Sequence, residues 1–243
     1  YLFRKKSEYV MRLLKKSGYS LKLLGQRGLS DVFESLLSNA GYDELDEQFD
    51  NLRRVDQKGK RELRLKLIMK IEYRLKKMKK RLKSDYEKNL DVITDLLNLT
   101  SGETRLLECF LINLIQSDLE DFTDNLGSLT LHKAISVWSV MTKISTNEIR
   151  KSLSAKSNFL NSGLVELENE TSGNNNLERI YKLSETLITA FTSPYREKQN
   201  VWQHFFKSVP ATELDSSCFE HLHEELELLE CLLKSTIEHG QKG

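Results

Sequence analysis

The stretch from Leu131 to Ser184 restricts the fold most, because helical and strand-like patterns alternate within a short length of chain. Apolar residues at helical spacing run from Leu131 to Met141 and are followed by a polar turn and a second short helical pattern. A break of small residues at 157–163 then leads to an apolar strand at 164–167. The polar loop 170–176 separates this strand from a second strand-like run, residues 177–183. The predicted order is helix, turn, helix and a two-stranded hairpin.

This order is the profile of a winged-helix unit, in which the hairpin forms the wing. Thr146 is the predicted N-cap of the second helix, Asn147–Leu153, and Ser184 the predicted N-cap of a closing helix, Glu185–Phe191, which Pro194 stops. We expect a mainly α fold class: a helical N-terminal region with a long basic helix, a winged-helix-like middle domain with a small two-stranded wing, and a C-terminal helical connector. Such a fold favours recognition over catalysis.

The predicted domain boundaries follow these changes of pattern. We expect a helical region at 1–98, the winged-helix-like domain at 99–194 and a helical connector at 195–243. Thr100 and Glu103 have the spacing of a capping box, which predicts that a helix with a broad apolar face begins there.

The C-terminal region combines an aromatic cluster with an acidic helical pattern. Trp202, Phe205 and Phe206 are predicted to form a core or interdomain plug. The run Phe219–Ile237 carries leucines at helical spacing and several glutamates, which predicts an amphipathic helix with an acidic face. This face is a candidate complement for the basic helix, within the fold or between subunits.

Positive charge is concentrated in one segment of a nearly neutral chain. Residues 53–83 contain 15 Lys/Arg and 3 Asp/Glu, a balance of +12, so the rest of the chain carries 1 − 12 = −11. Residues 60–98 contain neither Gly nor Pro, which predicts one long helix. Its apolar stripe steps by three or four residues and consists of Leu63, Leu67, Ile71, Leu75, Met78 and Leu82. The basic stripe beside it consists of Lys70, Arg74, Lys77 and Arg81.

Two interpretations of this basic stripe stay open. The four cations are candidate contacts for nucleic-acid phosphate or for an acidic protein, with strong salt dependence. Alternatively they are the solvated face of a packed helix, with their aliphatic stems covering apolar surface. A membrane-surface role is less favoured, because such a helix would carry Trp or Phe on its apolar face, whereas this one offers only Tyr73, which lies off the main stripe.

The second short helix of the winged-helix-like unit offers another candidate contact surface. In DNA-binding proteins of this type that helix enters the major groove, and here it would present Arg150, Lys151 and Lys156. The strand and loop of the wing instead carry Glu166 and Glu170, which would repel phosphate. Duplex binding and a protein-contact or structural role are both retained.

Composition argues against several other classes of protein. No run approaches the roughly 18 apolar residues of a membrane span, and no apolar stretch follows the basic start as in a secretory signal. The three cysteines are an odd number at wide spacing, which favours reduced thiols and a cytoplasmic location.

No residue pattern in the sequence indicates a catalytic or metal-binding site. Four residues of types that bind metal ions lie near one another in the sequence: Cys218, His221, His223 and Cys231. On one helix the four do not share a single face, so no metal site is predicted. Neither glycine-rich phosphate loop motif occurs, and Ser162-Gly163 lacks the flanking glycines of a nucleophile elbow. We predict no catalytic, cofactor-binding or metal-ligating residue and no small-molecule substrate.

Several short phrases resemble the region upstream of the ATPase core in a group of bacterial AAA+ ATPases. The resemblance covers roughly residues 96–243 and is carried by Leu99–Leu107, Ile144–Ile149, Phe159–Val165 and Leu183-Ser184, followed by the acidic, leucine-rich lead-in Leu226–Gly243. It implies a parent protein that binds ATP and Mg and whose phosphate loop lies beyond residue 243. It transfers no ATP-contacting residue to this sequence.

The leading hypothesis is therefore a non-catalytic recognition or regulatory region of a bacterial AAA+ ATPase, which binds a protein partner or nucleic acid and positions it for the ATP-driven core. One alternative is a free-standing winged-helix regulator that binds nucleic acid. A second is a structural module that self-associates through its basic and acidic helices. The candidate partner contacts are Lys70, Arg74, Lys77, Arg81, Arg150, Lys151 and Lys156.

Overall fold

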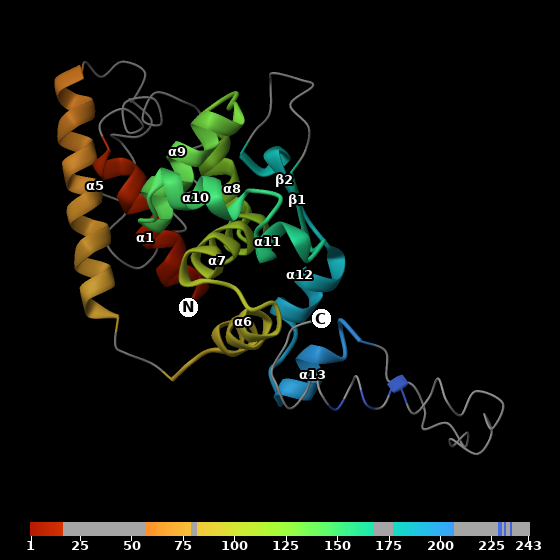
Figure 1. The fold of residues 1–243 in the computed structure, drawn as a ribbon. Helices are drawn as coiled ribbons and strands as arrows, with labels where there is room; N and C mark the ends of the chain where they lie inside the picture. Colours follow the sequence, from red (N-terminus) through yellow and green to blue (C-terminus); the bar gives the residue numbers. More distant parts are fainter. Residues whose placement is uncertain are drawn as a thin grey trace. The chain divides into compact units, whose positions relative to one another are not determined.

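A computed structural model describes residues 1–16, 57–78, 82–167 and 177–206, together with residues 228, 229, 231 and 234. These residues are mainly helical, with one two-stranded antiparallel sheet (Figure 1). The elements are α1 (Leu2–Lys15), α5 (Gln57–Lys77), α6 (Asp85–Leu96), α7 (Ser101–Ile115), α8 (Ser117–Asp124), α9 (Leu131–Thr142), α10 (Thr146–Ser152), α11 (Asn158–Asn161), β1 (Val165–Leu167), the 3-10 turn η1 (Leu177–Ile180), β2 (Tyr181–Leu183), α12 (Glu185–Thr192) and α13 (Lys198–Trp202).

The chain forms two compact units, Tyr1–Phe205 and Phe206–Gly243. The predicted boundaries after residues 98 and 194 stay predictions. In the first unit, α1 packs against α5, α7 and α9, and Figure 1 shows α1 running beside α5.

The predicted basic helix ends earlier than expected. The sequence predicted one helix over residues 60–98, but α5 ends at Lys77 and a separate helix, α6, begins at Asp85. Ser84 stops any continuous helix, because its side chain accepts from the Glu87 backbone N–H while the Glu87 carboxylate accepts from the Ser84 backbone N–H. This capping box fixes a helix start, so the prediction of a single helix was wrong.

Helix α6 is held in place by a buried amide. Asn89 is completely buried, and its Nδ2 donates to the carbonyls of Phe191 and Ser193 at the end of α12. Because carbonyls at a helix C-terminus have no partner within the helix, this side chain supplies donors that the end of α12 needs.

The helix–turn–helix part agrees with the sequence except at one cap. Lys143 ends α9 in the left-handed conformation, with φ of 62°, and α10 begins three residues later, at Thr146. The N-cap is Ser145, whose side chain accepts from the Glu148 N–H, so the prediction of Thr146 was wrong by one residue. The caps predicted at Thr100 and Ser184 are confirmed.

The two strands form a short antiparallel pair. Val165 lies opposite Leu183, and Leu167 lies opposite Tyr181. The predicted second strand began at residue 177, but residues Leu177–Ile180 form a 3-10 turn and only Tyr181–Leu183 form a strand. The predicted wing loop lies outside the described residues.

An aromatic cluster joins α7, α9, α11 and β2. The Phe110 ring of α7 stacks on Tyr181 of β2, with ring centroids 3.9 Å apart, and meets Trp138 of α9 at 4.8 Å and Phe159 of α11 at 5.9 Å. The buried Tyr181 hydroxyl donates to the Phe110 carbonyl. The core of the first unit is therefore centred on Phe110.

The aromatic residues near the C-terminal side of α13 do not form the predicted core plug. Phe205 packs partly against the core, but Trp202 is 44% exposed and Phe206 is 58% exposed. A core position was wrong for these two residues, and the alternative of an interdomain contact stays a prediction.

Candidate functional site

Helix α5 has two apolar sides, of which one is buried. Leu63, Leu67 and Ile71 are buried in the core on the side that faces α1. A second line, spaced by four residues, consists of Leu65, Met69 and Tyr73, which are 55%, 68% and 59% exposed. Large apolar side chains in one exposed line mark interaction surfaces more often than single exposed residues do.

Exposed cations flank this second line. We define the α5 outer face as Arg61, Leu65, Lys66, Met69, Tyr73, Lys76 and Lys77, all of which are exposed. At 100° per residue these positions share one side of the helix, centred on Met69. Glu62 is exposed on the same side, whereas Glu72 pairs with Lys15. The face combines an apolar centre with a positively charged rim.

The predicted stripe of Lys70, Arg74, Lys77 and Arg81 is divided between different environments. The guanidinium of Arg74 lies 4.5 Å from the Phe3 ring centroid of α1, and its partial burial lowers the pKa of this group. Lys70 is half-buried. Only Lys77 belongs to the α5 outer face, with its Nζ 4.4 Å from the Tyr73 ring centroid, and Arg81 lies outside the described residues.

The cations predicted around α10 are all exposed, and one of them, Arg150, contacts neighbouring side chains. Arg150 contacts Asn147 at 3.4 Å and the His132 ring at 3.2 Å. Lys151 and Lys156 line a hollow of about 430 Å³ that also contains two carboxylates. The lining residues are Thr100, Glu103, Glu148, Lys151, Ser152, Ser154, Lys156, Ser157 and Asn158. The charges in this hollow cancel, so it has no strong preference for an anion.

The strands add no positive surface to α10. Glu166 and Lys182 are both exposed and lie opposite each other in the register of the two strands. Opposite charges at such positions attract across the pair. The charges at this position of the two strands are therefore balanced.

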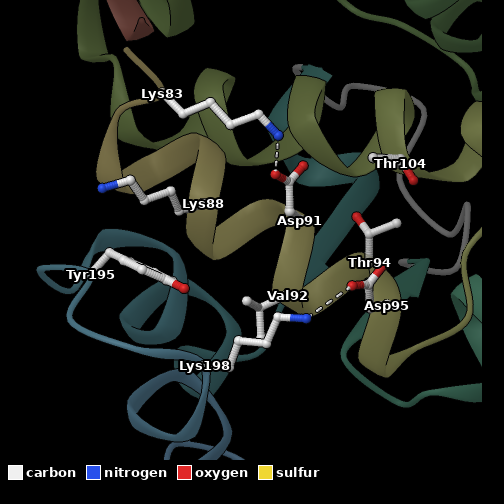
Figure 2. A pocket seen from close by; sticks show the side chains of 9 residues that line it. All are labelled: Lys83, Lys88, Asp91, Val92, Thr94, Asp95, Thr104, Tyr195 and Lys198. Atoms are coloured by element: carbon white, nitrogen blue, oxygen red, sulfur yellow. Dashed lines mark hydrogen bonds and ion pairs between the residues drawn. The ribbon is translucent and has the colours of Figure 1, made fainter.

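A hollow of about 400 Å³ between α6, α7 and α13 combines lysines with aspartates. Figure 2 shows Lys83 directed toward Asp91 and Lys198 toward Asp95, the latter pair 3.9 Å apart. The buried Thr94 hydroxyl has no hydrogen-bond partner. Asp91 and Asp95 neutralise Lys83 and Lys198 within the hollow, and Lys88 pairs with Asp85 outside it at 3.5 Å, so the hollow is not a strongly charged binding site.

The thiol of Cys109 lies in the core and is predicted to be inert. Cys109 is 1% exposed, and burial raises the pKa of its thiol well above the ordinary value. We expect iodoacetamide to label exposed Cys231 in the folded protein at pH 8 and to label Cys109 only after urea is added, as followed by peptide mass spectrometry. Fast labelling of Cys109 without urea would contradict this packing.

The same raised pKa has a consequence for stability at high pH. In the unfolded chain the thiol loses its proton near about pH 8.5, whereas the folded protein keeps it at that pH. The unfolded state then binds fewer protons, so stability falls as pH rises from that value. Cys109→Ala should reduce this slope in urea denaturation between pH 8 and pH 10.

The described residues contain no group of three or more His, Cys, Asp and Glu that could hold a metal ion. Of the predicted loose cluster, only Cys231 lies among these residues. None of the described helices combines the length and hydropathy that a bilayer crossing requires.

Comparison with known proteins finds no similar protein. The chain matches no protein-family model, no curated protein and no solved structure. Its function must therefore be argued from its own surfaces.

The α5 outer face is the surface that sequence reasoning missed. The signal was present, because Leu65, Met69 and Tyr73 step by four just as the buried stripe does. The sequence alone does not say which of two apolar stripes the neighbouring helix covers.

Proposed function

We propose that this chain is a non-catalytic recognition module, and that its α5 outer face binds an acidic amphipathic helix of a partner protein. The observation that carries the proposal is the exposed line of Leu65, Met69 and Tyr73 between cations. An amphipathic helix laid along such a line would present side chains at i, i+3, i+4 and i+7. Its glutamates or aspartates would meet the positively charged rim.

The apolar centre would supply much of the affinity. Full burial of a side chain of this size contributes about 1.5–3 kcal/mol. More than half of the surface of each of these three side chains is exposed, so a partner could still bury it. Tyr73 also resembles the aromatic anchors of many interfaces. Association costs several kcal/mol in lost freedom of motion, so we expect an affinity of about 1–100 μM.

The charged rim would mainly increase the rate of association and the specificity for acidic partners. Arg61, Lys66, Lys76 and Lys77 carry four positive charges against the single exposed carboxylate of Glu62. Such a rim attracts acidic partners over distances of about 10 Å at moderate ionic strength. Binding should therefore weaken as salt is added.

The placement of this module beside an ATPase core is also a proposal. Its support is the resemblance of residues 96–243 to the region upstream of that core in bacterial AAA+ ATPases. In that setting the α5 outer face would hold the partner while ATP is hydrolysed elsewhere in the parent protein. A partner-binding role for α5 does not depend on this placement.

The experiment is a fluorescence anisotropy titration of a labelled acidic amphipathic peptide with the full chain. The probe has the sequence of residues 219–237 with Ser in place of Cys231, because this run carries five Glu, one Lys and leucines at helical spacing. We expect saturable binding that weakens between 50 and 500 mM NaCl.

Matched variants assign the binding surface. The variant Leu65→Gln/Met69→Gln/Tyr73→Gln should weaken binding at least tenfold, which corresponds to about 1.4 kcal/mol. Leu82→Gln changes another exposed apolar residue, 96% exposed, and should leave affinity within twofold. Equal effects of both variants, or no binding by the wild type, would overturn the proposal.

A second candidate function is nucleic-acid binding through α10. The observation that favours it is the exposure of Arg150, Lys151 and Lys156 on and just after the second helix of a helix–turn–helix arrangement. A labelled 20-bp duplex in the same assay tests it. Salt-dependent binding that is lost in Arg150→Gln/Lys151→Gln/Lys156→Gln and kept in the α5 variant would favour nucleic acid over the protein partner.

A further inference from the structure

A polar hollow of about 270 Å³ lies where α1, α7 and the end of α9 meet. We call it the α1–α7 hollow. Its lining residues are Lys5, Tyr9 and Arg12 of α1, Arg105 and Glu108 of α7, and Thr142 and Lys143 at the end of α9. On α1, positions 5, 9 and 12 share one side of the helix, which brings both cations to the same wall.

Glu108 is the only carboxylate in this lining, and it is fully engaged. It accepts hydrogen bonds from the Tyr1 hydroxyl, from Lys5 Nζ at 2.9 Å and from the Tyr9 hydroxyl at 3.1 Å. Its side chain is only 10% exposed. Glu108 therefore neutralises Lys5 and has little capacity to neutralise the other cations of the hollow.

Arg12 is held rigidly and keeps an unused donor. One of its terminal nitrogens donates to the Met141 carbonyl and the other to Glu8, 3.1 Å away. Its Nε is buried and has no hydrogen-bond partner. A buried donor without a partner destabilises the protein unless an acceptor reaches it.

Two further cations border the hollow without any acidic partner among the described residues. Arg105 and Lys143 are exposed and form no hydrogen bond or ion pair through their side chains there. Lys5 is balanced by Glu108, and Glu8 is shared between Arg12 and Arg4, so Arg105 and Lys143 leave a net charge of at least +2 at the hollow.

The backbone at Lys143 adopts a conformation that is unusual for lysine. Lys143 ends α9 with φ of 62°, a conformation for which glycine is the common choice. A lysine in that conformation is less stable than glycine would be. The sequence nevertheless places a long cation there, at the edge of the hollow.

We propose that the α1–α7 hollow binds the phosphate or diphosphate group of a small ligand. An oxyanion with two or more charges matches the net charge of +2, and the combination of an arginine fork with a lysine is a common phosphate-binding set. The hollow has room for about nine waters at ~30 Å³ each, which suits a phosphate group with a small substituent. This site is distinct from the α5 outer face.

The test uses inorganic pyrophosphate as the probe and isothermal titration calorimetry with the full chain. We expect one saturable site with a dissociation constant of about 1 mM or below. Arg105→Gln/Lys143→Gln should weaken it at least tenfold. Lys182→Gln/Lys198→Gln removes the same charge from other exposed surfaces and should stay within twofold. An equal loss in both variants, or a heat that does not saturate, would overturn the proposal.

Lys143→Gly separates binding from folding. Glycine relieves the left-handed backbone, so the melting temperature should rise, while the loss of the cation should weaken pyrophosphate binding. A variant that melts higher and binds as tightly as the wild type would show that Lys143 has no part in a phosphate site. If a 20-bp duplex displaces pyrophosphate in the wild type, the site serves nucleic acid and the small-ligand proposal fails.

Discussion

Phe110→Ala is expected to lower the free energy of unfolding by about 3–5 kcal/mol, the cost typical of removing a large aromatic side chain from a core. The Phe110 ring is completely buried and contacts three other aromatic rings, those of Tyr181, Trp138 and Phe159. We expect the neighbouring rings to fill little of the space that it leaves, because they belong to separate elements. Urea denaturation followed by circular dichroism measures the loss.

Two comparisons make this result specific. Phe110→Leu keeps most of the volume and should cost clearly less than the alanine variant. Leu82→Ala removes an exposed side chain and should change stability by no more than about 0.5 kcal/mol. If Phe110→Ala lost less than 1 kcal/mol, about the median for any substitution, the aromatic cluster would not be the centre of the core.

Glu108→Leu is expected to cost about 2–4 kcal/mol. The change removes the acceptor of the buried Tyr9 hydroxyl and leaves Lys5 without its ion-pair partner. Breaking a fully buried pair costs about 3–5 kcal/mol, and the lower range applies because the Lys5 side chain is 30% exposed and can turn toward water.

A double-mutant cycle with Tyr9→Phe tests this account of Glu108. Tyr9→Phe removes the hydroxyl donor, so Glu108→Leu should cost less in the Tyr9→Phe background than in the wild type. Additive costs would mean that the hydrogen bond between these residues contributes nothing. Thermal or urea unfolding of the four proteins supplies the comparison.

Caps and periodicity could be predicted from the sequence because they depend on neighbouring residues. The Thr100 and Ser184 caps follow from side chains that reach backbone groups three residues away. The signature of a further cap, Ser84 with Glu87, was also present, but the unbroken apolar spacing across residues 78–82 favoured one continuous helix. At this position the local capping box, and not the apolar spacing, determines where the helix begins.

The candidate site could not be predicted in the same way, since it depends on which surfaces other elements cover. Helix α1 covers Leu63, Leu67 and Ile71 and leaves Leu65, Met69 and Tyr73 exposed, although both sets have helical spacing. For the same reason Arg74 was predicted to be a partner contact but lies on the Phe3 ring. The α1–α7 hollow needs three elements, and spacing along one of them does not reveal it.

The most direct test of the central claim is photo-crosslinking at the centre of the α5 outer face. Benzoylphenylalanine would replace Met69 in one protein and Leu82 in a control, and each would be irradiated with the 219–237 peptide. The proposed function predicts an adduct at position 69 that disappears at high salt, with little adduct at position 82. Equal adducts at both positions, or none at position 69, would contradict a docking surface on α5.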